Sequence, residues 1–298
     1  MSVTIVVPIH GGAGVLAGCL ASLARTVPAS VPVELVDDAS RDAEVDRLVA
    51  AFARDRPSAR VVVHERNLGF VRSVDDAMAR TRDDVVLLNS DTVVTTGWLE
   101  RLLACAASDA RIATATPFSN NAEICSFPAF CRANPVPDDP EAIARAAASV
   151  APQYPDLPTA VGFCMYLRRA ALDAVGGFDA ATFGRGYGEE NDFCLRAAAH
   201  GWRNVLCDDA YVVHVGGQSF GPLGERPGGE NLARLVARYP RYNALVADFI
   251  ARDPLKARRE KIAAVLGASS GATKVANEKL PVAASAAPTQ VLRKGRNP

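Results

Sequence analysis

The stretch Val3-Thr4-Ile5-Val6-Val7-Pro8-Ile9 decides the fold of this chain. Its apolar, mostly β-branched residues form an almost unbroken run, and a glycine-rich segment at 11–14 follows it. Runs of this kind are typical of strands in a parallel sheet that is buried on both faces. We therefore expect a buried strand over residues 3–9.

Strands and helices alternate over the following hundred residues. The pattern predicts strands at 33–36, 61–64, 85–88 and 112–116, and helices at 15–25, 42–54, 70–81 and 97–107. Such alternation indicates an α/β fold with an open central sheet, which binds ligands at the carboxyl ends of its strands.

The pattern loosens after Pro117. It predicts helices at 139–150, 169–175, 189–200, 231–238 and 242–251, strands at 161–167, 205–207 and 211–215, and a glycine-rich loop at 176–188. Beyond residue 267 a run of Ala, Ser, Thr and Pro without periodicity is typical of a linker or a disordered tail.

Composition and charge limit the classes of function. The chain has 298 residues, of which 49% are hydrophobic and 22% charged, so it can bury a sizeable core. Lys and Arg number 33, as do Asp and Glu, which gives no formal net charge. Phosphate-backbone binding needs clustered cations, so we expect no nucleic-acid partner.

The positive charge gathers near the C-terminal end. From Asp253 onward there are nine cations and three carboxylates, and every lysine lies in this part. The basic segment 256–261 leaves two alternatives open, a solvated helix face or a peripheral contact with anionic lipid.

Cysteine usage and the absence of long apolar windows indicate the compartment. The seven cysteines form no C-x-x-C pair, which is typical of buried thiols in a reducing environment. No window approaches the ~18 uninterrupted apolar residues of a membrane-spanning helix. We expect a cytoplasmic protein, at most peripheral on the inner face of a membrane.

Polar side chains follow two of the predicted strands. Asp37-Asp38 ends the second strand and Asn89-Ser90-Asp91 ends the fourth, so both clusters are expected at the same edge of the sheet. Mg²⁺ or Mn²⁺ bound through one or two carboxylates and the phosphates of a substrate suits this edge. The alternative is that these residues only cap the helices that follow.

A second acidic cluster, Glu189-Glu190-Asn191-Asp192, follows the glycines of the 176–188 loop and opens a predicted helix. Repulsion between neighbouring carboxylates raises the pKa of one of them, which suits a general base. The alternative is a helix-capping role, because acidic residues also favour a helix N-terminus.

Seven motifs in order make the chain resemble family-2 glycosyltransferases of the GT-A fold, in particular the branch of rhamnosyltransferase-like and O-antigen or polysaccharide biosynthesis proteins. The motifs are Val3–Pro8, Val36–Ser40, Asn67–Phe70, Leu87–Asp91, Gly162–Met165, Gly176–Asp179 and Gly186–Arg196. The resemblance covers about residues 3–220 and implies a mixed central sheet flanked by helices.

The resemblance implies inverting transfer of a hexosyl or deoxyhexosyl group, with rhamnose as the first expectation, from a nucleoside-diphosphate donor to an acceptor hydroxyl. Matched residue by residue, it implies donor contacts at Pro8, Asp37, Asp38, Asn67, Gly69, Asn89 and Ser90, acceptor contacts at Tyr187 and Glu189, a divalent cation (Mn²⁺ or Mg²⁺) at Asp91 and His214, and the catalytic base at Glu190 with Asp192 as the alternative. His214 belongs to a His-Gly-Gly-like segment with Gly216, Gly217 and Ser219.

Three positions depart from the family pattern. His10-Gly11 stands where many members have Tyr-Asn, Asn89 replaces the first Asp of Asp-X-Asp, and Glu190 replaces an Asp. Asn89 removes one negative charge from the expected metal site, and Glu190 adds one methylene to the reach of the base.

The expected organisation is one GT-A domain at 1–252, with a nucleotide-binding half at 1–117 and an acceptor and catalytic half at 118–252. A C-terminal helix at 253–267 and a disordered tail or linker at 268–298 complete it. The expected acceptor is a glycan or lipid-linked glycan of a cell-surface polysaccharide, and other glycosyltransferase domains are candidate partners.

Two other functions stay as alternatives. A weakly catalytic module that binds sugar nucleotides or glycans within a tandem enzyme fits Asn89 and the open-ended tail. A nucleotide-dependent dehydrogenase is disfavoured, because Gly11-Gly12-Ala13-Gly14 lacks the G-x-G-x-x-G spacing.

Overall fold

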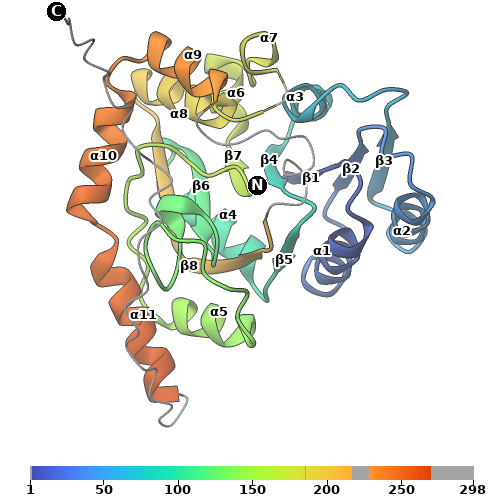
Figure 1. Cartoon of the computed structure of the whole chain (residues 1–298). Helices are drawn as coiled ribbons and strands as arrows, with labels where there is room; N and C mark the ends of the chain where they lie inside the picture. Colours follow the sequence, from blue (N-terminus) through green and yellow to red (C-terminus); the bar gives the residue numbers. More distant parts are fainter. Residues whose placement is uncertain (1, 185, 217–228, 270–298) are drawn as a thin grey trace, which may run out of the picture.

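Strand β1 (Val3–Ile9) forms where the sequence predicts it and lies inside a mixed sheet (Figure 1). The computed structural model describes residues 2–184, 186–216 and 229–269. Within these ranges eight strands are hydrogen-bonded in the order β3-β2-β1-β4-β7-β6-β8-β5. The predicted α/β class with a mixed central sheet is confirmed.

The first half of the sheet is parallel. β1 pairs with β2 (Val33–Asp37) and β4 (Asp84–Leu88), and β2 pairs with the edge strand β3 (Ala59–Val63). Ile9 lies opposite Asp37 in this register. The carboxyl ends of the strands therefore meet at one edge, as the sequence predicts.

The second half of the sheet mixes directions. β7 (Cys164–Leu167) runs antiparallel to both β4 and β6 (Ile112–Phe118), and β8 (Arg203–His214) runs parallel to β6. The short strand β5 (Thr92–Val94) pairs antiparallel with the end of β8, so that Thr92 lies opposite His214. The end of β8 therefore lies beside the segment that follows β4.

Two local predictions in this half are wrong. The two strands predicted at 205–207 and 211–215 are one continuous strand, because the intervening Asp208 and Asp209 are buried and paired with arginines instead of forming a turn. β5 was not predicted, because its three residues are too few for a periodic signal.

Helices cover both faces of the sheet in Figure 1. In the described residues they are α1 (Ala13–Thr26), α2 (Ala43–Arg54), α3 (Phe70–Arg80), α4 (Trp98–Ser108), α5 (Pro140–Ser149), α6 (Arg169–Val175), α7 (Ala180–Phe183), α8 (Glu189–Ala199), α9 (Glu230–Arg238), α10 (Tyr242–Arg252) and α11 (Lys256–Ser269), with a 3₁₀ turn at Glu123–Cys125. Of these, α7 lies within the segment predicted to be a loop.

Strand alternation divides the interior into two cores. Ile5 and Val7 of β1 point into one core, with α1, α2, α4 and α5, whereas Val6 points into the other, with α3, α6 and α8. Successive strand residues face opposite sides of a sheet, so a strand covered on both sides must be apolar throughout. This explains the unbroken apolar run at 3–9.

Helix α11 is docked on the domain through buried arginines. Arg258 forms a 2.5 Å ion pair with Asp208 of β8 and donates to the Ala151 carbonyl at 2.9 Å, while Arg259 lies over the Phe130 ring with 4.5 Å between the guanidinium carbon and the ring centroid. Both arginines are at most 7% exposed. The helix is therefore part of the folded unit.

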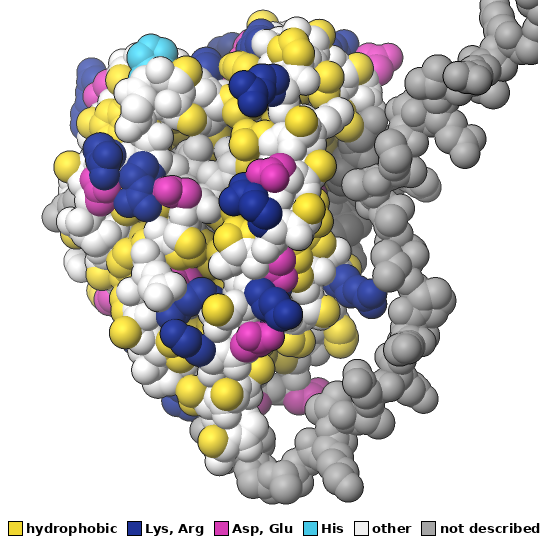
Figure 2. Space-filling model, turned by 90° about the vertical axis from the view of Figure 1, so that its left-hand side faces the viewer, with side chains coloured by type: hydrophobic (Ala, Val, Ile, Leu, Met, Phe, Trp, Pro, Cys, Tyr) yellow, Lys and Arg dark blue, Asp and Glu magenta, His cyan; other side chains and the backbone are white. Residues whose placement is uncertain are grey.

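The basic segment 256–261 is consequently split between two environments. Arg258 and Arg259 point inward, whereas Lys256 and Lys261 are exposed, and Lys256 lies 3.9 Å from Glu260. Figure 2, which looks onto the side formed by α10 and α11, shows cationic and anionic side chains interspersed. The described residues of this face therefore form no uniform basic patch.

Some expectations fall outside the described ranges. Gly217, Ser219 and the part of the predicted tail after Ser269 lie outside them. Helix α11 ends at Ser269. In the described residues no helix is long and apolar enough to cross a membrane.

We expect Arg258→Ala to lower the free energy of unfolding by about 3–5 kcal/mol, because it leaves the Asp208 carboxylate buried without its cation. Urea unfolding followed by circular dichroism measures this change. Lys261→Ala, at an exposed position of the same helix, is the control and should stay within about 0.5 kcal/mol of the parent. Equal stability of the two variants would contradict the docking role.

Candidate active site

Asp91 and His214 meet where β5 pairs with β8. One Asp91 carboxylate oxygen lies 3.4 Å from His214 Nε2, and the Val215 amide donates to the Asp91 carbonyl at 2.9 Å. Asp91 is 3% exposed, and its buried Oδ1 is the oxygen that faces His214 Nε2. The structure therefore brings together the two residues predicted to bind the metal.

Two contacts fix the orientation of His214. Its Nδ1 lies 2.6 Å from the Asn121 carbonyl, and its ring stacks on Phe163 with centroids 5.2 Å apart. Burial pushes the pKa of His214 down, but the Asp91 carboxylate and the Asn121 carbonyl outweigh burial and raise it. A carbonyl at Nδ1 leaves Nε2 facing Asp91, the arrangement of a histidine metal ligand with a supporting partner.

This donor set fits a divalent cation that is also held by substrate. In the described part of the chain, no group of three His, Cys, Asp or Glu side chains could enclose a metal ion. Asp91 and His214 supply one carboxylate and one imidazole, and diphosphate oxygens complete such sites in other proteins. The buried Asp91 Oδ1 and His214 Nε2, which face each other at 3.4 Å, are the donor atoms that favour a cation here.

Asn89 and Ser90 form the turn that leads into Asp91. The backbone amide of Asn89 donates to the Phe163 carbonyl at 2.8 Å, and the backbone carbonyl of Asn89 accepts a hydrogen bond from the Thr92 hydroxyl at 2.7 Å. Ser90 is 5% exposed. These backbone bonds join the end of β4 to the start of β7 and fix the place of Asp91.

Asp38 ties the end of β2 to the loop before α3. Its two carboxylate oxygens accept the amides of Leu68 at 2.7 Å and Gly69 at 2.8 Å, and Oδ1 also lies 2.9 Å from His64 Nδ1. Asp37 accepts the Ser40 amide at 2.9 Å and also the Ser40 hydroxyl. Both carboxylates are thus engaged in local structure at the place where donor contacts are predicted.

The half-buried side chains of His10 and Asn67 lie beside this tie. Asn67 Nδ2 is 3.1 Å from His10 Nε2, and His10 Nδ1 is 2.9 Å from the Asp38 carbonyl. Pro8 is half-buried in β1 opposite Val36. The predicted donor residues Pro8, Asp37, Asp38, Asn67 and Gly69 therefore share one end of the sheet.

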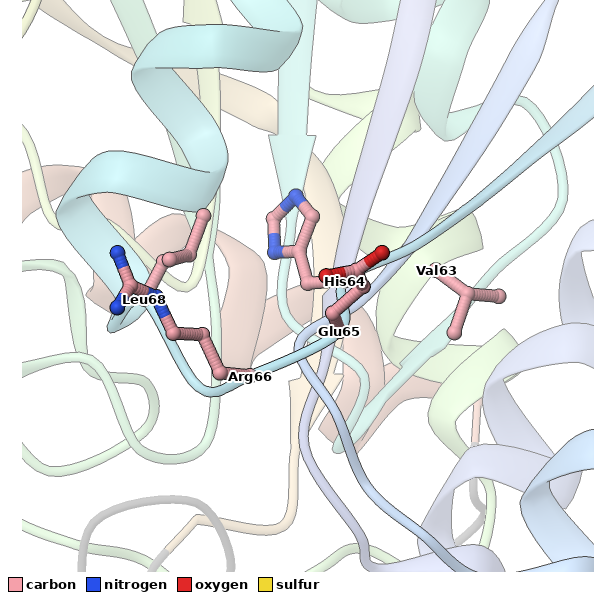
Figure 3. A pocket seen from close by; sticks show the side chains of 5 residues that line it. All are labelled: Val63, His64, Glu65, Arg66 and Leu68. Atoms are coloured by element: carbon pink, nitrogen blue, oxygen red, sulfur yellow. The ribbon is translucent and has the colours of Figure 1, made fainter.

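A surface depression of about 550 Å³ lies next to this end. It is lined by Val63, His64, Glu65, Arg66 and Leu68, whose side chains surround it in Figure 3. It adjoins the Asp38 tie through His64 and Leu68.

Glu189 and Glu190 stand at the N-terminus of α8, beside the entry to β7. A Cβ added to Gly162 would lie 3.9 Å from Glu190 Cγ. The ring of the next residue, Phe163, stacks on the His214 ring. The Gly188 amide donates to Glu190 Oε2 at 3.2 Å. One short strand entry therefore connects the predicted base with the predicted metal ligand.

Burial raises the pKa of both glutamates. For Glu189 the neighbouring Glu190 carboxylate raises the pKa further, whereas for Glu190 backbone N–H groups, including that of Gly188, partly offset burial. Glu189 is 4% exposed, and its Oε2 is buried without a partner. The more accessible Glu190 carboxylate thus has a raised proton affinity, as a general base at neutral pH requires.

Sequence reasoning missed two side chains at this place. Burial and the Glu190 charge raise the pKa of Glu123, and burial followed by the charges of Glu190 and Glu123 raises that of Tyr242. Glu123 has a φ of 46°, a left-handed conformation that a bulky side chain rarely adopts. That conformation has no sequence signal, because nothing in the motif pattern marks the 119–134 segment.

Asp192 occupies a different environment from Glu190. It is fully buried, and its oxygens pair with Arg196 at 2.8 Å, Arg238 at 2.7 Å and the Tyr239 hydroxyl at 2.9 Å. A carboxylate with no exposed surface and two guanidinium partners cannot reach an acceptor, which favours a structural role over the alternative base role.

Tyr187, a predicted acceptor contact, is half-buried in the loop before α8 and has a φ of 68°. The loop thus holds this aromatic residue directly ahead of the two glutamates.

We expect Asp192→Asn to lower the free energy of unfolding by about 3 kcal/mol, because two arginines lose their buried counter-charge. Glu190→Gln should leave stability close to that of the parent. Thermal unfolding of both variants tests this distinction. If Asp192→Asn were as stable as the parent, the ion-pair role of Asp192 would be refuted.

Comparison with known proteins identifies the family of this chain. The model of glycosyl transferase family 2 matches residues 4–176. A Mycobacterium tuberculosis protein, the uncharacterized protein Rv1525, is 31% identical over 209 residues, covering 66% of this chain and 75% of that protein. The chain therefore belongs to glycosyltransferase family 2.

Solved structures of similar architecture are GT-A glycosyltransferases. GalNAc-T7 with UDP, GalNAc and Mn²⁺ has a TM-score of 0.61 at 14% identity, covering 88% of this chain and 54% of that one. The Pyrobaculum calidifontis mannosyltransferase PcManGT, in complex with GDP-Man and Mn²⁺, has a TM-score of 0.55 at 15% identity, covering 92% and 76%. TarS 1-349 of S. aureus with UDP-GlcNAc has a TM-score of 0.56 at 16% identity, covering 88% and 70%. The fold is accordingly GT-A.

Proposed function

We propose that this protein is an inverting glycosyltransferase that moves a sugar from a nucleoside-diphosphate donor to an acceptor hydroxyl, with Glu190 as the base and Asp91 and His214 as the protein ligands of a divalent cation. The observation that carries the proposal is that the base and the two metal ligands lie at the same edge of the sheet. Glu190 lies against Gly162, and the adjacent Phe163 stacks on His214.

Glu190 would perform the proton transfer. Its carboxylate takes the proton of the acceptor hydroxyl while the hydroxyl oxygen forms a bond to the anomeric carbon and the bond to the diphosphate oxygen breaks. Attack from the face opposite the leaving group inverts the anomeric configuration. Burial keeps the pKa of Glu190 above that of an exposed glutamate, although a hydrogen bond from Glu189 partly offsets it.

Asp91 and His214 would hold Mn²⁺ or Mg²⁺ at the diphosphate. The bound ion would neutralise the negative charge that accumulates on the leaving diphosphate. Support comes from the facing Asp91 Oδ1 and His214 Nε2 atoms and from the Mn²⁺ in the GalNAc-T7 and PcManGT complexes. The Asn121 carbonyl would keep Nε2 of His214 directed at the ion.

The end of the sheet around Asp38 would hold the nucleoside. The similar structures contain UDP, UDP-GlcNAc or GDP-Man, which supports a nucleotide-sugar donor of this kind. Because the Asp38 oxygens already receive two backbone amides, the accessible polar groups of His10 and Asn67 would make the direct contacts. We further propose that the sugar is rhamnose and that the acceptor is a glycan or lipid-linked glycan. The reaction would belong to the synthesis of O-antigen or another surface polysaccharide.

We expect Glu190→Gln to lower kcat by roughly 10²–10⁴-fold with little change in donor affinity, because a general base contributes about that much to rate. Release of nucleoside diphosphate measures kcat, and calorimetry measures the donor Kd. Glu100→Gln, an exposed carboxylate on α4, is the control. Near-normal turnover of Glu190→Gln would sink the assignment of the base.

The same base predicts the pH dependence. Burial raises the pKa of Glu190, and the carboxylate must be ionised to accept a proton, so kcat is lost as pH falls through this raised value. We expect the acidic limb of the kcat–pH profile to lie above the usual glutamate value of about 4.3. Steady-state rates across pH 4–9 locate the limb, and Glu190→Gln should remove it.

We expect Asp91→Asn to weaken Mn²⁺ binding in the presence of a nucleoside diphosphate by about 10-fold or more, because the buried carboxylate is the charged ligand of the pair. Electron paramagnetic resonance of free Mn²⁺ measures the affinity. Asp55→Asn, at an exposed position, is the control. Unchanged Mn²⁺ affinity in Asp91→Asn would contradict the metal assignment.

The donor class is found by calorimetry with UDP-, GDP- and dTDP-sugars, with and without Mn²⁺. Metal-dependent binding of one donor, followed by its slow hydrolysis, supports the transferase. Binding without hydrolysis or transfer favours the sugar-nucleotide-binding module instead.

A further inference from the structure

The loop between α7 and α8 contains several residues with positive φ angles. Gly184, Gly186, Tyr187 and Gly188 have φ angles of 56°, 142°, 68° and 112°. Glycine reaches such angles without steric cost, but it also has the widest freedom to leave them. The loop's own hydrogen bond, from the Gly186 amide to the Phe183 carbonyl at 3.1 Å, therefore needs support from contacts outside the loop to hold the observed conformation.

Helix α9 supplies the outside contact through one side chain. Asn231, in its first turn, donates from Nδ2 to the Phe183 carbonyl at 2.7 Å and to the Gly186 carbonyl at 2.6 Å. Both acceptors are backbone atoms, so the carboxamide holds the loop whatever its side chains do. The Asn231 carbonyl also lies 3.8 Å from where a Cβ on Gly188 would be.

The neighbouring arginines fix the orientation of this carboxamide. Arg234 donates to Asn231 Oδ1 at 2.8 Å and to the Thr182 carbonyl at 3.0 Å. The carboxamide oxygen is therefore engaged on the side of α9, and its N–H groups point to the loop. Arg238, one turn later, pairs with Asp179 ahead of the loop and with Asp192 behind it.

The last residue of the loop reaches the base. The Gly188 amide donates to Glu190 Oε2 at 3.2 Å. Gly188 packs so closely on Phe183 that an added Cβ would lie 3.0 Å from the ring. A shift of the loop would therefore move the hydrogen bond that orients the Glu190 carboxylate.

We propose that Asn231 is a positioning residue for the base: its carboxamide holds the Phe183 and Gly186 carbonyls, and through the Gly188 amide that follows, it fixes the Glu190 carboxylate. This inference rests on the proposed function, because it takes Glu190 as the group that removes the acceptor proton. It adds α9 to the machinery, although α9 lies beyond the part of the chain that the family model matches.

The surroundings of Glu190 make this amide important. The titratable groups that face Glu190 in the described residues are Glu189 and Cys194 on α8, Glu123 on the 3₁₀ turn and Tyr242 on α10, and all are acids. When ionised, Cys194, Glu123 and Tyr242 oppose ionisation of Glu190, whereas hydrogen bonds from the Gly188 N–H and from Glu189 favour it. Release of the loop should therefore raise the pKa of Glu190.

The test compares Asn231→Ala and Asn231→Asp with the parent. Asn231→Asp keeps the size of the side chain but places a carboxylate against two carbonyls, so it removes the donors without a cavity. Asn243→Ala, the same change at an exposed position on α10, is the control. Thermal unfolding shows that each variant is folded.

Three readouts separate positioning from stability. The first is hydrogen exchange of the amides at 186–190, and the second is kcat for nucleoside-diphosphate release from the donor that the calorimetric panel selects. The third is the acidic limb of the kcat–pH profile. We expect faster exchange, a kcat about 10–100-fold lower at an unchanged donor Kd, and an acidic limb displaced to higher pH, because a small misplacement of a catalytic group costs this much.

The outcomes distinguish the two proposals. Unchanged exchange at 186–190 in both Asn231 variants, or faster exchange with unchanged kcat and pH limb, overturns the positioning role while the transferase stands. If the parent itself releases no nucleoside diphosphate from any donor of the panel, the proposed function fails first and the positioning role fails with it.

Discussion

The antiparallel pairing of β5 with β8 is the interaction on which the candidate site depends. It places Thr92 opposite His214 and so brings the imidazole to Asp91. Every other contact of the site builds on this one: the Asn121 carbonyl and the Phe163 ring fix His214, and the strand entry at Gly162 and Phe163 joins it to Glu190. A three-residue strand thus determines where the chemistry can occur, because without it the loop after β4 and the end of β8 have no common position.

The N-terminus of α8 shows how neighbouring carboxylates acquire different roles. Asp192 is neutralised by Arg196 and Arg238, which converts it into a fixed point of the scaffold. In the described residues Glu189 and Glu190 pair with no such cation; burial raises the pKa of both, and the Glu190 charge raises that of Glu189 further. One helical turn therefore contains both a carboxylate that arginines of α8 and α9 neutralise and a carboxylate whose pKa burial raises.

Sequence patterns predicted most of the strands and helices, since buried strands such as β1 and amphipathic helices have periodic signals. They also predicted that Asp37, Asp38 and Asp91 gather at one edge, because parallel strands share a direction. They did not predict β5, the continuity of β8 through Asp208 and Asp209, or the proximity of Glu123 to Glu190. These features arise from pairings between distant segments, and neither a short strand nor a single asparagine such as Asn231 has a local pattern that reveals its partner.

The ion pair between Asp208 and Arg258 also has a consequence for synthesis of the chain. Asp208 belongs to a fully buried part of β8, while its counter-charge comes from a helix made about fifty residues later. As the chain leaves the ribosome, the sheet can form around β8 before α11 exists, but the carboxylate then lies in the interior without its arginine. Burying an unpaired charge is costly. The nascent domain should therefore stay loosely closed around β8 until α11 emerges, so that its final step of consolidation occurs late in translation.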